Sequence, residues 1–292
     1  MGSTLIRPVL ILGVIAAFGL LYGPIVLRLA EDWANDDNYS HGFLIGPLAA
    51  YFVWERRHRL ASLAIRPSVI GLPVILFGLL MFLTGLLGAE LFLPRASLIV
   101  VLTGTVLFLS GWQTCRVLAL PVAFLVLMIP IPALIFNQIA FPLQLLASRV
   151  GETVLSALSI PVLREGNVIV LAHTSLEVAE ACSGIRSLIS LLTLGIVYGY
   201  FMDPRGGVRT TIALSTIPIA IIANGARVAG TGIAAHYYGP AAAQGFFHTF
   251  SGWIVFAAAF VMLFAVAHTV IRLAPRREQT QELPAVAAER AV

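Results

Sequence analysis

The sequence predicts an all-α polytopic membrane protein of about eight transmembrane helices, and three observations lead to this fold class. The first is composition: 59% of the 292 residues are hydrophobic and only 11% are charged, whereas soluble domains carry about 25% charged residues. The second is a mean hydropathy of +0.94 for the whole chain. The third is a series of apolar runs close to the roughly 20 residues that span a bilayer.

These apolar runs predict the helices in order. The predicted spans are 8–29, 39–54, 69–88, 96–112, 117–136, 182–201, 211–235 and 248–273. The second and fourth are short, so we expect them to be partly re-entrant or packed inside the bundle. The first run lacks a small-residue cleavage site, which favours a retained helix over a removed signal peptide.

Arginines set the expected orientation, because lysine is absent and all 18 basic residues are arginine. They follow alternate helices, at Arg56, Arg57, Arg59, Arg66, Arg116, Arg205, Arg209, Arg272, Arg276 and Arg277. The loops between carry mainly acids, at Glu31, Asp32, Asp36, Asp37 and Glu90. Basic loops stay in the cytoplasm, so both termini are expected there. The net charge of +4 is explained by these loops, and no nucleic-acid partner is expected.

The longest region outside the predicted spans is residues 137–181, an extracytoplasmic insertion. Its first part, 137–160, is apolar and somewhat amphipathic, and is either an interfacial helix or a further half-span. Residues 162–171 predict a small hairpin around a Glu-Gly-Asn turn, and 174–178 predict another strand. We therefore expect one membrane domain over residues 1–274 and a polar, disordered cytoplasmic tail over 275–292.

The stretch Glu-Ala-Cys-Ser-Gly-Ile-Arg-Ser at 180–187 follows that insertion and opens the sixth predicted helix. Cys182 would lie in its first turn, where unpaired backbone N–H groups and the helix dipole favour an anion such as a thiolate. The alternative is that Cys182 is a small buried hydrophobe. The only other cysteine is Cys115, so no disulfide framework is indicated.

The predicted topology brings three side chains from three helices to one membrane depth. Cys182 begins the sixth helix at its outer end, Arg227 lies in the outer half of the seventh, and His248 begins the eighth. Asn224 shares a helix face with Arg227. An arginine near the bilayer centre costs at least about 2.5–3.5 kcal/mol, so it should face a partner or a wet cavity. Alternatively, Arg227 snorkels to the headgroups and His248 caps its helix.

Several other polar residues belong near the same face. Arg186 would share a face with Cys182 and would pair with Glu180 or with a lipid phosphate. His41 starts the second helix at the outer side and competes with His248 as a base. No metal-ligand spacing is present, and we expect no cofactor.

Four motifs together resemble the exosortases and the related archaeosortases, which are polytopic membrane cysteine transpeptidases. They are the stretch at 180–187 with Gly184, Asn-Gly-Ala-Arg-Val at 224–228, His248 with Gly252, and Tyr-Ser-His-Gly at 39–42 with the arginines that end that helix. The resemblance covers roughly residues 39–273. It implies that Cys182 is the nucleophile and that Arg227 and His248 complete the site.

The resemblance also implies a substrate and a location. The enzyme would act at the outer face of the cytoplasmic membrane. It would cleave a C-terminal sorting signal on exported proteins, consisting of a short Pro-containing motif, an apolar helix and a basic end. It would then pass the acyl group to an unknown amine or to water, in an exopolysaccharide or surface-anchoring system. The hairpin at 162–171 is a candidate to bind the motif as an added strand.

Two other functions remain open at this point. In the first, the protein is a transporter or assembly component for an exported polysaccharide, with Asn224 and Arg227 lining a polar path. In the second, it is a structural subunit of a secretion complex. Cys182 would be incidental in either.

The charge pattern gives a testable topology. Reporter fusions after Arg59, Arg209 and Arg277 should report the cytoplasm, and fusions near Asn35, Asn167 and Gly239 should report the outer side. A fusion at Asn167 that reports the cytoplasm would separate the proposed site from exported substrates and rule the mechanism out.

Overall fold

The computed structural model describes residues 2–172, 174–178, 184–239 and 246–274, with side chains except those of 2–11 and 246–251. Within that part, six helices are long and apolar enough to cross a membrane: Leu12–Asn35, Phe92–Ser110, Ala133–Ala157, Ile185–Met202, Gly206–Tyr238 and Gly252–Leu273. Three apolar helices are shorter: Gly42–Glu55, Gly71–Leu87 and Trp112–Met128. The all-α polytopic fold is confirmed, and the count of eight is left open.

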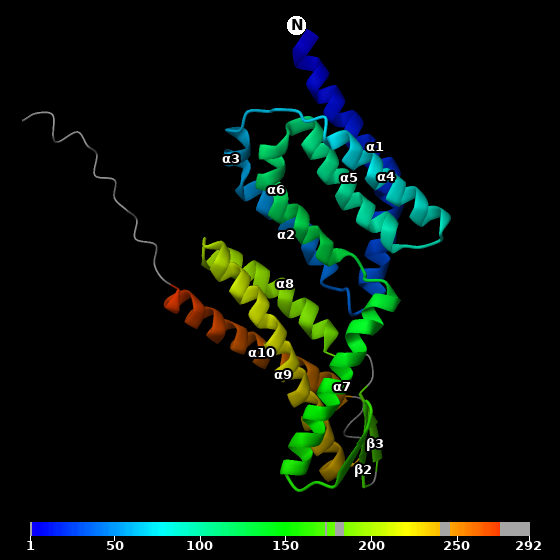
Figure 1. Ribbon diagram of the computed structural model, residues 1–292, viewed down its shortest axis with the longest axis vertical. Coiled ribbons are helices and arrows are strands. Elements are labelled where there is room, and N and C mark those ends of the chain that lie inside the picture. Colours follow the sequence, from blue (N-terminus) through cyan, green and yellow to red (C-terminus); the bar gives the residue numbers. More distant parts are fainter. Residues whose placement is uncertain (1, 173, 179–183, 240–245, 275–292) are drawn as a thin grey trace, which may run out of the picture.

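Helices α1 to α6 form the N-terminal half of the molecule (Figure 1). They are α1 (Gly2–Asn35), α2 (Gly42–Glu55), α3 (Arg57–Ala61), α4 (Gly71–Leu87), α5 (Phe92–Ser110) and α6 (Trp112–Phe124). A core that includes Ile45, Phe52 and Phe124 fills this half. At its edge Arg95 pairs with Asp32 at 2.5 Å. The fourth predicted helix, 96–112, corresponds to α5, which has 19 residues and is not short.

The fifth predicted helix, 117–136, differs from the structure. Helix α6 begins earlier, at Trp112, and a 3-10 turn at Leu125–Met128 ends it. The sequence then reads Ile-Pro-Ile-Pro at 129–132. Proline lacks an N–H and pushes the preceding residue toward extended backbone, so two prolines in alternation prevent a helix here. Residues 133–136 belong to the next helix instead.

That next helix is α7 (Ala133–Ala157), which covers most of the segment expected over 137–160 to be an interfacial helix or a further half-span. Its second half packs along α9, where Gly151 lies against Val228 and Gly232 against Leu155. It also packs against a small sheet, which it joins through an ion pair between Glu152 and Arg164 at 2.8 Å. It has 25 residues and is one of the six candidate spans.

The sheet confirms the predicted hairpin and adds the third strand to it. Strands β1 (Val162–Glu165), β2 (Val168–Leu171) and β3 (Thr174–Glu177) are antiparallel in the order β1-β2-β3. Gly166 turns the first hairpin with φ 65°, the left-handed value that a Gly-first hairpin turn needs. Ile169, Leu171 and Val178 are buried against α7 and α9.

Helices α8 (Ile185–Met202), α9 (Gly206–Tyr238) and α10 (Phe246–Leu273) form the C-terminal half, with α9 between the other two (Figure 1). Helix α9 is the most buried of the six candidate spans. Its 33 residues make it roughly 50 Å long at about 1.5 Å per residue, against about 30 Å for the hydrocarbon core of a bilayer. It therefore extends well beyond a bilayer at one end or both.

One end of the bundle gathers the arginines of α2, α9 and their flanking turns, as the charge pattern predicts. The Tyr200 hydroxyl donates to the Glu55 carboxylate, and the Arg209 guanidinium lies 4.4 Å from the centre of the Tyr200 ring. Arg205 pairs with Asp203 at 2.6 Å and donates to the carbonyl of Ala274 at 3.0 Å. The hydrogen bond from Arg205 lowers the pKa of the Asp203 carboxyl. These contacts join the ends of α2, α8 and α10 to the start of α9.

The close packing of α7 on α9 gives a stability prediction. A Cβ on Gly225 would lie 2.7 Å from Val150 Cγ1, whereas nothing lies within 4 Å of a Cβ on Gly230 of the same helix. Gly225→Ala should therefore destabilise the protein by about 1–3 kcal/mol, the usual cost of overpacking. Gly230→Ala is the matched control and should be neutral or slightly stabilising. Thermal unfolding midpoints in one detergent measure both, and equal shifts would contradict the packing described.

Candidate active site

The candidate site begins where α8 begins. The helix starts at Ile185, three residues later than predicted, because its N-cap Gly184 has φ 78° in the left-handed region. A non-glycine residue is strained there, so the glycine in this motif has a backbone role. The first turn of α8 is therefore formed by Ile185 and the residues after it. Cys182 and Glu180 lie outside the described residues.

Gly184 contacts Asn224 of α9. A Cβ on Gly184 would lie 2.7 Å from Asn224 Cγ, so the absence of a side chain is what allows the asparagine amide to lie against this backbone. Asn224 is 5% exposed. The structure thus brings together two residues that are 40 positions apart in the sequence and that we predicted to share one membrane depth.

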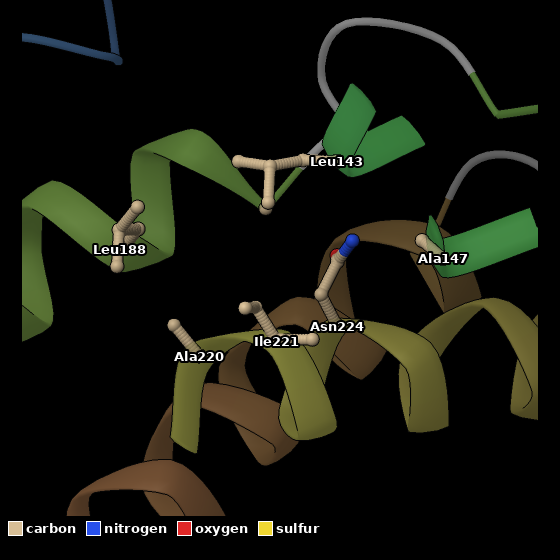
Figure 2. A pocket seen from close by; sticks show the side chains of 7 residues that line it. Leu143, Ala147, Leu188, Ala220, Ile221 and Asn224 are labelled. Carbon is tan, nitrogen blue, oxygen red and sulfur yellow. The ribbon is translucent and has the colours of Figure 1, made fainter. Parts of the chain in front are cut away.

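A pocket adjoins this contact (Figure 2). Besides Gly184, its lining consists of Leu143 and Ala147 of α7, Leu188 of α8, and Ala220, Ile221 and Asn224 of α9. It has room for about one water molecule. Asn224 is the polar side chain in an otherwise apolar lining, as Figure 2 shows. Sequence reasoning did not identify the α7 residues, because nothing in their apolar pattern marks them.

Arg227 lies one turn further along α9 and approaches α10. A Cβ on Gly252 would lie 3.6 Å from Arg227 Nη2 and 3.8 Å from its Cζ, so the guanidinium lies close to the backbone of α10. His248 belongs to the first turn of α10 (Phe246–Leu273). It precedes Gly252 by four residues, which places both on one helix face. The side chain of His248 is outside the part that the structure describes.

Arg186 has partners that the sequence did not indicate. Its Nη1 donates to Asp37 at 3.2 Å and its Nε to Asn38 Oδ1 at 3.2 Å. Both partners lie in the turn between α1 and α2. The lipid phosphate and Glu180 were the expected partners, and Glu180 is not described. Arg186 therefore fastens the start of α8 to the N-terminal half.

His41 lies in that same turn, just before α2. Its Nε2 is 3.0 Å from the carbonyl oxygen of Leu127, and a carbonyl only accepts, so Nε2 carries the proton. Burial lowers the pKa of His41, and the carbonyl groups beside it offset only part of that effect. Tyr39 and Trp33 bind the same chain segment, at the N–H of Ile131 (3.2 Å) and the carbonyl of Met128 (2.9 Å). His41 thus has a clear structural partner in a neutral form.

Within the described ranges, no group of three or more His, Cys, Asp or Glu side chains could hold a metal ion.

A model of the family described as transmembrane exosortase (Exosortase_EpsH) matches residues 33–265. The chain belongs to this family. Membership supports a membrane transpeptidase-like role in general, since exosortases are cysteine transpeptidases. The match contains every candidate residue named above, and it covers all of the chain from the end of α1 to well into α10. Searches of curated proteins and of solved structures gave no match.

The contact between Gly184 and Asn224 can be tested by a double-mutant cycle. Gly184→Ala should destabilise the protein through both the left-handed backbone, at about 1–2 kcal/mol, and the clash with Asn224. Asn224→Ala removes the 2.7 Å contact with Cγ but keeps Cβ, 2.9 Å from the added methyl group, so it relieves part of the clash. The double variant should therefore be less destabilised than the sum of the two singles, with a coupling of about 0.5–3 kcal/mol. Thermal unfolding in detergent measures all four proteins. Strict additivity would contradict the contact.

Proposed function

We propose that this protein is a membrane cysteine transpeptidase that cleaves C-terminal sorting signals from exported proteins. One observation carries the proposal: the contacts of Asn224 with Gly184 and of Arg227 with Gly252 join the three motifs of the resemblance at one end of the bundle. Cys182 is two residues before Gly184, and His248 is one turn before Gly252. A nucleophile, a base and a cation therefore belong to segments that meet at α9.

In the proposed reaction, the Cys182 sulfur attacks the carbonyl carbon of the peptide bond that precedes the transmembrane tail. His248 accepts the thiol proton and then gives it to the leaving amine as the C–N bond breaks. Arg227 donates hydrogen bonds to the oxyanion of the tetrahedral intermediate. The resulting thioester is attacked by an amine, or by water, which restores the thiol. Asn224 and Gly184 position the segment that bears Cys182, and Arg186 anchors the helix behind it.

The site is proposed to lie at the outer face of the cytoplasmic membrane. The arginines of the opposite end support this orientation through the positive-inside rule. Asn224 and Arg227 lie in the second half of α9, the half that is further from that end. A substrate anchored by its own apolar tail would approach through the bilayer with its cleavage motif outside. The proposed partners are therefore the lipid bilayer and this tail, and the identity of the acceptor is open.

The function is tested by co-expression with candidate tailed proteins and measurement of tail loss by mass spectrometry. Cys182→Ala should abolish cleavage while the protein still inserts and accumulates. Cys115→Ala, which changes the other cysteine of the chain, should cleave like the wild type. Undiminished activity of the Cys182→Ala variant would instead favour a transporter or a structural subunit, because either tolerates this small substitution.

Arg227 gives a sharper test of mechanism. Lysine also reaches the headgroups with a long stem, but it lacks the planar fork of donors. If Arg227 orients donors at the oxyanion, Arg227→Lys should accumulate normally and lose about 100- to 1000-fold in rate, the usual effect of removing one such donor. Single-turnover tail cleavage at matched protein amounts measures this. Near-wild-type cleavage would mean that Arg227 supplies charge alone.

A further inference from the structure

We propose that the outer edge of β3 binds the sorting signal as an extended strand and leads its scissile bond toward Cys182. The inference rests on the proposed function and adds a binding site and a binding mode to it. The proposed ligand is a peptide segment that is held mainly through its backbone. The site would therefore select for an extended conformation more than for particular side chains.

Strand β3 is at the edge of the sheet. The order β1-β2-β3 leaves β3 with one strand neighbour within the described residues. The opposite edge, β1, packs against α7, to which Arg164 is tied by its ion pair with Glu152. A further strand would therefore be added at β3, on the side of the sheet that is away from α7.

The register shows which groups of β3 point outward. The N–H of Val178 donates to the carbonyl of Asn167 at 2.9 Å. Two residues before Val178, Leu176 faces Ile169 of β2. In an antiparallel pair, facing residues alternate between exchanging hydrogen bonds and not exchanging them. Leu176 and Val178 therefore bond to β2, and the N–H and C=O groups of Ser175 and Glu177 point away from it. Both residues are exposed.

The sheet that carries β3 is packed against the core. Ile169 and Val178 are 0% and 3% exposed, so the inner face of the sheet is part of the core that α7 and α9 share. An exposed edge with a buried inner face is the usual geometry for strand addition, in which backbone bonds give affinity. Figure 1 shows the sheet beside α7, at the end of the molecule away from the arginine-rich turns.

The path from the edge to the nucleophile is short. Cys182 follows Glu177 by five residues, so covalent geometry keeps their Cα atoms within about 18 Å, at no more than about 3.6 Å per residue. Beyond the part that pairs with β3, the peptide would need roughly the same number of residues to reach the thiol of Cys182. The apolar tail beyond the scissile bond is then free to remain in the bilayer.

The test is an N-methyl scan of a tailed peptide that the wild type cleaves, or of the best candidate tail if cleavage is absent. Affinity is measured by titration with full-length Cys182→Ala in detergent, so that binding is read without turnover. N-methylation removes one backbone donor at a time. We expect affinity losses of roughly three- to tenfold at every second residue of the segment, the worth of one net hydrogen bond, and little loss at the residues between.

The enzyme side offers a matched pair of variants. Proline is tolerated on edge strands where the N–H faces outward, so Ser175→Pro removes an outward donor and keeps the β2 ladder. It should weaken peptide binding about three- to tenfold, while Ser175→Ala, which keeps the N–H, should bind like the parent protein.

The outcomes separate the two proposals. Loss of the period-two pattern, equal effects of Ser175→Pro and Ser175→Ala, or no peptide binding would overturn the strand-addition site. Binding with the period-two pattern, but without cleavage by the wild-type enzyme, would uphold the binding site and overturn the proposed reaction.

Discussion

The close approach of α7, α8 and α9 around Asn224 is the constraint on which the proposed site depends. Lipid tails are as apolar as leucine, so helices in a membrane are held mainly by close packing and by polar contacts. Here small residues permit that packing: Gly184 admits the Asn224 side chain, and Gly225 admits Val150 of α7. A side chain at Gly184 would push the start of α8 away from α9, and one at Gly225 would push α9 away from α7. Close helix packing thus explains why glycine occupies these positions in the motifs, in addition to any role in the chemistry of the site.

The N-terminal half contributes to the site by holding it. The turn between α1 and α2 binds the start of α8 through Arg186, and it binds the segment after α6 through Tyr39 and His41, beside Trp33 of α1. His41 is engaged as a donor to a backbone carbonyl, and burial keeps its pKa low. The hydrogen bond from Nε2 to Leu127 gives His41 a structural role, and the neutral form that its lowered pKa favours is equally the form that a base needs. The family motif at 39–42 then reads as part of the scaffold.

Sequence patterns predicted the fold class, most helices and the hairpin, because apolar length and turn chemistry are local properties. They misplaced the helix at 117–136, where the local rule for proline should have outweighed the apolar run. The start of α8 was missed because Gly184 adopts a left-handed conformation before the helix, where it lies against Asn224, a residue distant in sequence. The same limit applies to the site: Arg227 was found by its cost in a membrane and Asn224 by its place on the same helix face, whereas Leu143 and Ala147 have no local mark.

The position of Arg227 also explains how a charged site can exist beside an apolar bundle. Its guanidinium lies against Gly252, and α10 continues from there with Ala259, Leu263 and Ala267, all buried against α9. These residues follow Gly252 at intervals of seven, four and four, so they form one face of α10. Apolar side chains pack along this face as far as Ala274, whose carbonyl accepts from Arg205. Arg227, which is half-buried, therefore lies near the start of α10, and the other end of this face carries the paired charges of Arg205 and Asp203.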